Sequence, residues 1–354
     1  MYIYIILIFS LALLSIVEWK VFDNHKIKAF VLLCFVTILC VLSSLRWDTG
    51  QDFFTYIDIY NYIPSIFSGE NIFIGYKNIE PGFKLLASFS KIFDDEVVFL
   101  FLCCAFSLFP IACGIIKLNK IESFGFFFPL LIYFLVFMIN YNFNAMRQAI
   151  TMGLFVYALS DMYYRKWLKV MVISFVGLLF HSTGGLIFIS YLMYFNFKID
   201  FSKHKRLFFI FSPLSVFLIV FNPLSHILQF VGVNVENWRE AWGGVEVSSI
   251  VFRLMIVFLM IFPLKIYQSS RLAKLLFNFY LYGMLFYFAL FDVGMMATRF
   301  NMFFRVIEVI LVPLIIYHMR YFSNKAFSSI VFVALFIVLF YSTVQVDVNV
   351  YKFR

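Results

Sequence analysis

Long apolar runs recur along the whole chain, and they limit its possible folds more than any other feature of the sequence. Hydrophobic residues make up 64% of the 354 residues, whereas charged residues make up only 13%. Soluble domains contain about 45–50% apolar and about 25% charged residues. No water-soluble core absorbs this much apolar surface, so we predict an all-α, polytopic integral membrane protein.

The lengths of the apolar runs predict about eleven or twelve transmembrane helices in a single integral membrane domain, residues 1–354. Runs of roughly 16–20 apolar residues have the length of a membrane-crossing helix. The predicted spans are residues 1–17, 28–45, 97–116, 123–139, 146–163, 167–180, 182–195, 207–221, 248–264, 272–291, 299–317 and 326–341. The first span has no cleavage site after it and is expected to be retained. Polar residues and two glycines at 181–185 favour a break over one long tilted helix.

Basic residues gather in alternate loops between these spans. The loops hold well over half of the 28 basic residues and few of the 19 acidic ones. Because short loops rich in Lys and Arg stay in the cytoplasm, the pattern predicts that both termini lie outside it. The net charge of +9 therefore reflects orientation in the membrane, and no nucleic acid is expected as a partner.

The two longest polar segments, residues 46–96 and 222–247, are extracytoplasmic loops in this orientation. Both are rich in Tyr, Trp, Asn and Gly. Such residues stack on sugars and hydrogen-bond to them, but Trp and Tyr also line membrane interfaces. A carbohydrate ligand and a simple interfacial position are both open readings of these loops.

Three arginines fall at the predicted outer ends of membrane spans. Arg147, Arg253 and Arg299 have no acidic residue one helical turn away. Ionisable groups inside a bilayer are costly and mark functional sites. Several guanidiniums at one membrane face suit a phosphate, because their planar forks bind its oxygens in pairs. A phosphate beside sugar-binding loops suggests a lipid-linked glycan.

Other charged and reactive residues have simpler structural interpretations. Arg305 and Glu308 are one turn apart near mid-bilayer and are expected to neutralise each other. The acidic run 94–96 is expected to cap a helix rather than to bind a metal ion. The five cysteines all lie inside hydrophobic runs without the spacing of a metal site, so they are interpreted as buried apolar residues.

Several short motifs, in this order along most of the chain, resemble the EpsG-like branch of the Wzy polysaccharide polymerases. They are Arg46-x3-Gly50-x-Asp52-x3-Tyr56, Glu80-Pro81-Gly82-Phe83, Arg147-Gln148, His181-Ser182-Thr183-Gly184 and Arg299-Phe300. The resemblance implies a multi-pass enzyme of the bacterial inner membrane, similar to GT-C-type glycosyltransferases. It would polymerise undecaprenyl-diphosphate-linked repeat units into O-antigen, capsular or exopolysaccharide chains at the outer face. Family polymerases have both termini in the cytoplasm, opposite to the charge pattern here.

The resemblance also implies partners and roles for individual residues. The partners would be undecaprenyl-diphosphate-linked glycans, a chain-length regulator protein and membrane lipid, with no cofactor and no metal. The candidates for binding the diphosphate or the glycan are Arg46, Arg147, Arg253, Arg299, Tyr56 and Glu80. The guanidiniums would stabilise charge on the leaving diphosphate. Either Asp52 or His181 would take the proton of the attacking hydroxyl.

Residues 46–56 are predicted to form a re-entrant lip of the active site. Gly50 would let the chain turn sharply, and Tyr56 would offer a stacking face to a sugar. Trp47 and the neighbouring phenylalanines would hold this lip at the bilayer surface.

Two other function classes remain open. A flippase for lipid-linked oligosaccharides would need charges along a path through both leaflets, and Arg305 with Glu308 keeps that alternative open. A membrane acyltransferase that modifies surface glycans would need a cytoplasmic histidine beside an acyl-donor channel. The histidines on the predicted cytoplasmic side are loop residues among lysines, so an enzyme acting outside is the better fit.

Overall fold

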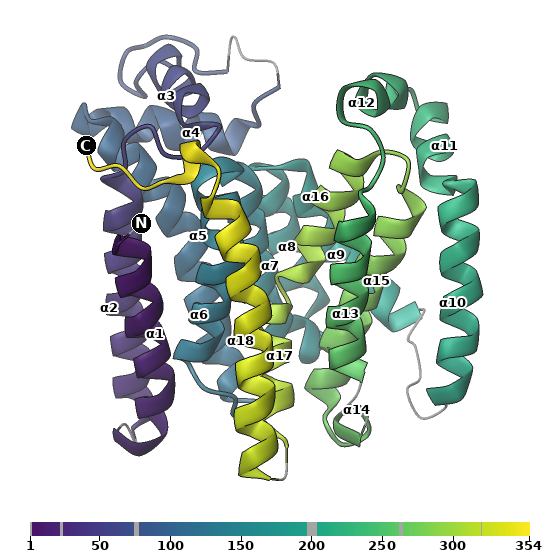
Figure 1. Ribbon diagram of the computed structural model, residues 1–354. Coiled ribbons are helices and arrows are strands. Elements are labelled where there is room, and N and C mark those ends of the chain that lie inside the picture. Colours follow the sequence, from purple (N-terminus) through teal and green to yellow (C-terminus); the bar gives the residue numbers. More distant parts are fainter. Residues whose placement is uncertain (1, 22–23, 74–77, 197–203, 262–264, 320) are drawn as a thin grey trace. The chain divides into compact units, whose positions relative to one another are not determined.

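Helices form nearly all of the regular structure in this computed structural model (Figure 1). It describes residues 2–21, 24–73, 78–196, 204–261, 265–319 and 321–354. Within those ranges the extended pairing is limited to one isolated bridge, between Arg46 and Phe353. The prediction of an all-α polytopic membrane protein is confirmed, whereas the likeness to GT-C-type enzymes stays a prediction.

The described chain divides into two compact units. Unit 1 comprises Met1–Tyr191 and Arg320–Arg354, and unit 2 comprises Leu192–Met319. The prediction of a single membrane domain is not tested by this division and stays a prediction.

Unit 1 holds most of the long helices. Its helices are α1 (Tyr2–Val21), α2 (His25–Ser44), α3 (Phe53–Tyr62), α4 (Pro81–Ser90), α5 (Glu96–Asn119), α6 (Phe127–Tyr133), a π-helix (Phe134–Asn144), α7 (Met146–Tyr163), α8 (Trp167–Leu178), α9 (Gly185–Asn196, which continues into unit 2) and α18 (Phe322–Val344). Short 3₁₀ turns lie at Lys91–Phe93, Ser182–Gly184 and Asp347–Asn349.

The helices of unit 2 are shorter on average. They are α10 (His204–Phe221), α11 (Pro223–Phe230), α12 (Val235–Trp242), α13 (Val247–Ile261), α14 (Lys265–Ser269), α15 (Arg271–Ala289), α16 (Gly294–Arg305) and α17 (Glu308–Tyr317).

Length and hydropathy qualify some of these helices as membrane spans. Five helices in the described ranges are long and apolar enough to cross a bilayer, or up to seven if two bent helix pairs each count as one span. The helices Tyr2–Glu18, Trp167–Leu178 and Val247–Ile261 are apolar but shorter. The expected number of eleven or twelve spans exceeds what length and composition support and stays a prediction.

The packing of unit 1 is closest between α5 and α7, which lie side by side (Figure 1). A Cβ on Gly153 of α7 would stand 2.3 Å from the carbonyl oxygen of Ser107 in α5. Only glycine permits this approach of two backbones, as is common where helices pack in membranes. The close contact fixes α7, whose first turn carries Arg147.

One helix break lies where the sequence predicts it, and another divides a segment that the sequence predicts to be one continuous span. The chain leaves α8 after Leu178 and enters α9 at Gly185, so the predicted break at 181–185 is confirmed. The predicted span 299–317 is instead divided into α16 and α17, with an angle of 44° between them. Arg305 therefore ends one helix and Glu308 begins the next.

The predicted loop 46–96 folds back onto α5 instead of extending freely. It contains α3 and α4, whose apolar faces join one buried cluster with residues of α5 and α7. Phe53, Tyr60, Phe83 and Phe99 are among its members, and the rings of Tyr60 and Phe99 are stacked with centroids 5.4 Å apart. At the start of α5, Asp95 accepts a hydrogen bond of 2.8 Å from the Val97 amide, so the predicted capping role of the acidic run is confirmed.

The C-terminal tail, residues 345–354, returns to the loop that follows α2 (Figure 1). The Trp47 amide donates to the Lys352 carbonyl at 2.9 Å, and the Arg354 amide donates to the Leu45 carbonyl at 3.0 Å. Near the other terminus, the Tyr4 hydroxyl donates to the Asn349 carbonyl at 2.9 Å. Both ends of the chain therefore lie at the same end of unit 1 as residues 46–52. The side of the membrane that they face stays a prediction from charge.

Candidate functional site

Arg147 forms the centre of a polar cluster at the first turn of α7. Its Nη1 donates to Glu80 Oε2 at 2.5 Å and to the Asn78 carbonyl at 3.1 Å. Both side chains of this ion pair are partly exposed, Arg147 by 25% and Glu80 by 21%. The Arg147 Nε is buried and finds no hydrogen-bond partner among the described residues. The ion pair therefore fixes one edge of the guanidinium, and its Nε donor finds no acceptor among the described residues.

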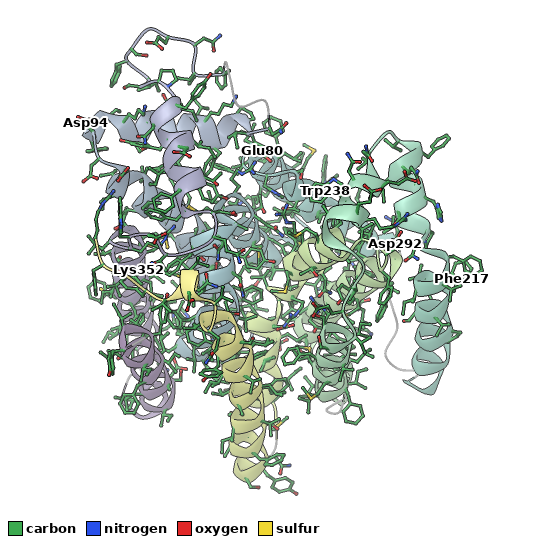
Figure 2. All side chains as sticks on the ribbon, turned by 45° about the horizontal axis from the view of Figure 1, so that its top comes forward. Glu80, Asp94, Phe217, Trp238, Asp292 and Lys352 are labelled. Atoms are coloured by element: carbon green, nitrogen blue, oxygen red, sulfur yellow. The ribbon has the colours of Figure 1, made fainter. Side chains whose placement is uncertain are left out.

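Glu80 is held by the start of α4. It is the N-cap residue of that helix, and Pro81 occupies the first helical position, where its fixed backbone angle and missing amide are both tolerated. The Gly82 amide donates to the Leu179 carbonyl at 2.7 Å, which attaches the start of α4 to the end of α8. Figure 2 labels Glu80 at this end of unit 1. Glu80 thus pairs with Arg147 in this structure, and its role in glycan binding stays a prediction.

Tyr56 lies on α3 against the same arginine. Burial raises the pKa of the Tyr56 phenol to about 12, and the nearby Arg147 guanidinium opposes that shift. The phenol is therefore protonated at neutral pH and can donate a hydrogen bond. Only 5% of the residue is exposed, and its ring packs against Phe83 with centroids 5.7 Å apart. The ring is enclosed in this structure, and its stacking on a sugar stays a prediction.

Asp52 stands at the point where the loop enters α3. Its side chain is half-buried, and its charge contributes to the raised pKa of Tyr56, so the carboxylate lies within electrostatic range of that phenol. The Asp52 amide donates to Asn144 Oδ1 at 3.4 Å. Gly50 makes the turn before it, with a φ of +103° and no room for a Cβ, which would stand 2.8 Å from the Phe143 carbonyl oxygen. The sharp turn that the sequence predicted at Gly50 is present.

Arg46 lies beneath this loop and has no exposed surface. Its Nη1 donates to the Ser43 carbonyl at 2.5 Å, and its Nε donates to the Thr49 carbonyl at 3.2 Å. The guanidinium also stacks on the Phe143 ring, 4.7 Å from its centroid. In this structure the guanidinium therefore holds the turn. The role of Arg46 as a phosphate ligand stays a prediction.

His181 lies in the break between α8 and α9. Its Nδ1 accepts from the Thr183 amide at 3.2 Å and lies 2.9 Å from the Thr183 hydroxyl. That hydroxyl lies 2.9 Å from the hydroxyl of Thr151, which is one helical turn after Arg147 on α7. Because Nδ1 accepts from a backbone amide, the neutral ring carries its proton on Nε2. The chain from His181 to Thr151 thus connects the histidine to the helix of Arg147.

Unit 2 contains the other two predicted arginines. Arg299 is exposed on α16, whereas Arg253 is buried on α13. The Arg253 Nε donates to Asn301 Oδ1 at 2.7 Å, and its guanidinium stacks on Tyr287, 4.2 Å from the ring centroid. The Tyr287 hydroxyl is buried and finds no partner within the described ranges.

The Arg305–Glu308 pair lies in the same unit and is buried. The Arg305 Nε and Nη2 donate to the two carboxylate oxygens of Glu308 at 2.5 Å and 3.0 Å. The Tyr280 hydroxyl also donates to Glu308, at 3.0 Å. The predicted mutual neutralisation of Arg305 and Glu308 is confirmed.

Sequence reasoning brought together some members of the unit 1 site and missed others. Tyr56, Glu80 and Arg147 converge in the structure, although they come from three separate motifs. The Asn78 carbonyl and the Thr151–Thr183 pair were not predicted. Thr151 had a usable signal, because it lies four residues after Arg147 and therefore on the same helical face. A search of the described residues for three or more His, Cys, Asp or Glu side chains that could hold a metal ion finds no such group.

Comparisons with known proteins identify one family. A model of the EpsG family matches residues 29–354. No curated protein and no solved structure matches this chain.

Proposed function

The chain belongs to the EpsG family, which includes Wzy-like polysaccharide polymerases, and from this premise we propose that it polymerises oligosaccharide repeat units carried on undecaprenyl diphosphate. The reaction would take place at the outer face of the bacterial inner membrane and would extend O-antigen, capsular or exopolysaccharide chains. A chain-length regulator protein and membrane lipid are the other proposed partners.

The proposed reaction is a glycosyl transfer between two lipid-linked glycans. The bond between the anomeric carbon of the growing chain and its diphosphate oxygen breaks, and a bond from that carbon to a hydroxyl of the new unit forms. The hydroxyl proton passes to a base on the protein, and undecaprenyl diphosphate leaves. No nucleotide takes part, because the donor sugar is already activated by its diphosphate.

The observation that carries this proposal is the buried Nε of Arg147, which has no acceptor among the described residues while Nη1 is paired with Glu80. A diphosphate oxygen would accept from Nε and from the remaining edge of the fork. Such a donor, held in place before the reaction, stabilises the charge that develops on the leaving oxygen. Glu80 would act as a positioning residue that sets the angle of the guanidinium.

Asp52 is the proposed base. A base must accept a proton, and the Nδ1 of His181 is already occupied by the Thr183 amide. The remaining nitrogen of the neutral ring carries the proton, so His181 is better suited to donate a hydrogen bond to a sugar or to the diphosphate. Asp52 lies half-buried at the mouth of the same cluster, and as a carboxylate it is able to take the proton.

Arg253 and Arg299 are proposed to bind the diphosphate or the glycan from unit 2. Arg253 brings a second donor group whose neighbour, the Tyr287 hydroxyl, has no partner in the described structure. Arg299 is exposed and presents its guanidinium at the surface of α16. These roles are independent of the unit 1 cluster, and substitution of each arginine tests them separately.

The deciding experiment is the surface-polysaccharide ladder of a deletion strain, complemented with the wild-type gene. Loss of a polymerase leaves single repeat units at the cell surface, because export continues without elongation. Loss of a flippase leaves no repeat units there. Single units in the deletion strain and restored long chains on complementation are expected, and an empty surface would contradict the proposal.

A further inference from the structure

A cavity opens at the end of α5, α7 and α8 that lies opposite Arg147. It follows the last turns of α5 and α7 and the start of α8, three helices that pack together in unit 1 (Figure 1). Its volume is about 640 Å³, within the range of about 300–1,000 Å³ typical of ligand sites. Its lining includes Lys117, Lys120, Asp161, Lys166, Lys169 and Val172.

The charges around this cavity do not balance. Four lysines line it, and Asp161 is the one carboxylate among the lining residues. Asp161 is 9% exposed and lies 3.9 Å from the ammonium of Lys117 and 3.7 Å from that of Lys166. Lys120 and Lys169 have no ion pair within the described residues. The cavity therefore has an excess of positive charge that an anion would neutralise.

The walls of the cavity are polar at one edge and apolar at the other. Lys117 stacks over the Tyr157 ring, 3.3 Å from its centroid, which holds this ammonium at the inner wall. Leu168 and Val172 line the outer edge and are 55% and 57% exposed, on a helix that is apolar apart from Lys169, Ser174 and Gly177. On a membrane helix, exposed aliphatic side chains of this kind face lipid tails. A ligand with a charged head and an apolar tail matches both edges.

We propose that this cavity binds the phosphate of an anionic phospholipid, with phosphatidylglycerol as the representative headgroup. The phosphodiester would lie among the four ammonium groups, and an acyl chain would run along Leu168 and Val172. Basic pockets between membrane helices on the cytoplasmic side commonly bind anionic lipid headgroups. The loops that supply these lysines are cytoplasmic by the positive-inside rule. The site is separate from the glycan-polymerising site and does not rest on the proposed function.

The test uses the full-length protein in a neutral detergent with equal amounts of phosphatidylglycerol and phosphatidylcholine, and native mass spectrometry measures the bound lipids. Phosphatidylglycerol is expected to dominate in the wild-type protein. Lys117→Gln with Lys169→Gln should lower its occupancy on the order of 25-fold, since each lysine near an anionic lipid contributes about fivefold in affinity. Lys117→Arg with Lys169→Arg should retain it, because the charge is kept. That second pair also shows whether loss of binding in the first pair reflects charge rather than misfolding.

A matched control removes two charges outside the cavity. Lys26 and Lys28 lie on the same predicted side of the membrane. The double variant Lys26→Gln with Lys28→Gln should leave phosphatidylglycerol binding unchanged. Equal losses in the two glutamine pairs would overturn the proposal, because the lipid would then respond to general surface charge. Equal binding of the two lipids by the wild-type protein would also overturn it. Displacement of the lipid by inorganic phosphate at millimolar concentration would assign the cavity to a soluble phosphate and overturn the lipid assignment.

Discussion

At the scale of single residues, Arg147 divides its donors between two tasks. Nη1 is engaged by Glu80 and by the Asn78 carbonyl, whereas Nε is buried without a described partner. An ion pair that is partly exposed contributes little stability, about 0–1 kcal/mol. Its value here is therefore geometric, because it fixes the plane in which the remaining donors point.

Replacing Arg147 with lysine separates charge from geometry. Arg147→Lys keeps the positive charge but loses Nε and the planar fork, so it should shorten the polysaccharide chains while the protein remains in the membrane at normal abundance. Loss of one transition-state donor lowers the rate on the order of 10²–10³. The measurement is the chain-length ladder together with an immunoblot of the membrane fraction. Glu80→Gln should produce a milder defect, and wild-type ladders from both Arg147→Ala and Arg299→Ala would contradict the diphosphate-binding role.

Asp52, at the entry to α3, and Asp58, within α3, provide a matched pair of variants that tests the proposed base. Asp52→Asn keeps the shape of the side chain but cannot take a proton, so long chains should disappear. Asp58 is exposed on the same helix, and Asp58→Asn should leave the ladder unchanged, as exposed substitutions change stability by less than about 0.5 kcal/mol. The assay is the sugar-chain length in a strain that lacks the native gene. Wild-type ladders from both variants would show that Asp52 is an ordinary loop residue.

The contacts that sequence reasoning missed are those between residues that lie far apart in the chain. Arg46 follows a predicted span and therefore resembles a ligand at the membrane surface. Its guanidinium is instead enclosed, with Phe143, 97 residues further on, contributing a carbonyl and a ring. In the same way, Glu80 lies 67 residues before Arg147. Spacing within one helix cannot reveal either contact, because both depend on how separate helices pack.

At the scale of helices, local sequence signals predicted one break and gave no sign of another. The break between α8 and α9 coincides with His181, Ser182 and Thr183 and two glycines, which disfavour a continuous helix. The break between α16 and α17 occurs at Val306 and Ile307, which carry no such signal. There the carboxylate of Glu308 is bound by both Arg305 and Tyr280. The spacing of apolar and polar residues along the chain cannot reveal a tertiary network of this kind.

The buried Arg305–Glu308 pair gives a stability prediction at this scale. Glu308→Leu alone leaves Arg305 buried without its partner, and breaking a buried pair in this way costs about 3–5 kcal/mol. Arg305→Leu with Glu308→Leu should recover most of that loss, since replacing both members by apolar residues is often neutral. Thermal unfolding of the detergent-solubilised protein measures both variants. A single variant as stable as the wild type would show that the pair is solvated rather than buried.

At the scale of the whole molecule, unit 1 is polar at two opposite ends. Arg147 begins α7, and Lys166 follows its last turn, so the two are separated by roughly 27 Å along a helix of 18 residues. That distance is close to the thickness of the hydrocarbon core of a bilayer, about 30 Å. The proposed polymerisation site and the lysine-lined cavity therefore lie at opposite ends of α7, and we expect them to face opposite sides of the membrane.

Orientation is tested by fusing reporters to the two faces. Alkaline phosphatase folds only outside the cytoplasm, so a fusion after Ser68 should be active and one after Lys120 should be inactive. Both positions lie in described segments outside the long helices, which limits disturbance of the spans. The reverse pattern would overturn the charge argument and would move every proposed catalytic residue to the cytoplasmic side.

The C-terminal tail has a consequence for how the protein is made. Residues 348–354 hold the turn that presents Asp52, through contacts such as that of the Lys352 amide with Thr49, 303 residues earlier. Figure 2 labels Lys352 on this tail. A ribosome delivers these partners only after helices α1 to α18 have been synthesised, so the turn before Asp52 is completed after those helices. A nascent chain already inserted in the membrane would thus lack the support of the turn before Asp52 until residues 348–354 are translated, and a nonsense mutation before them would yield an inserted protein whose turn is not held.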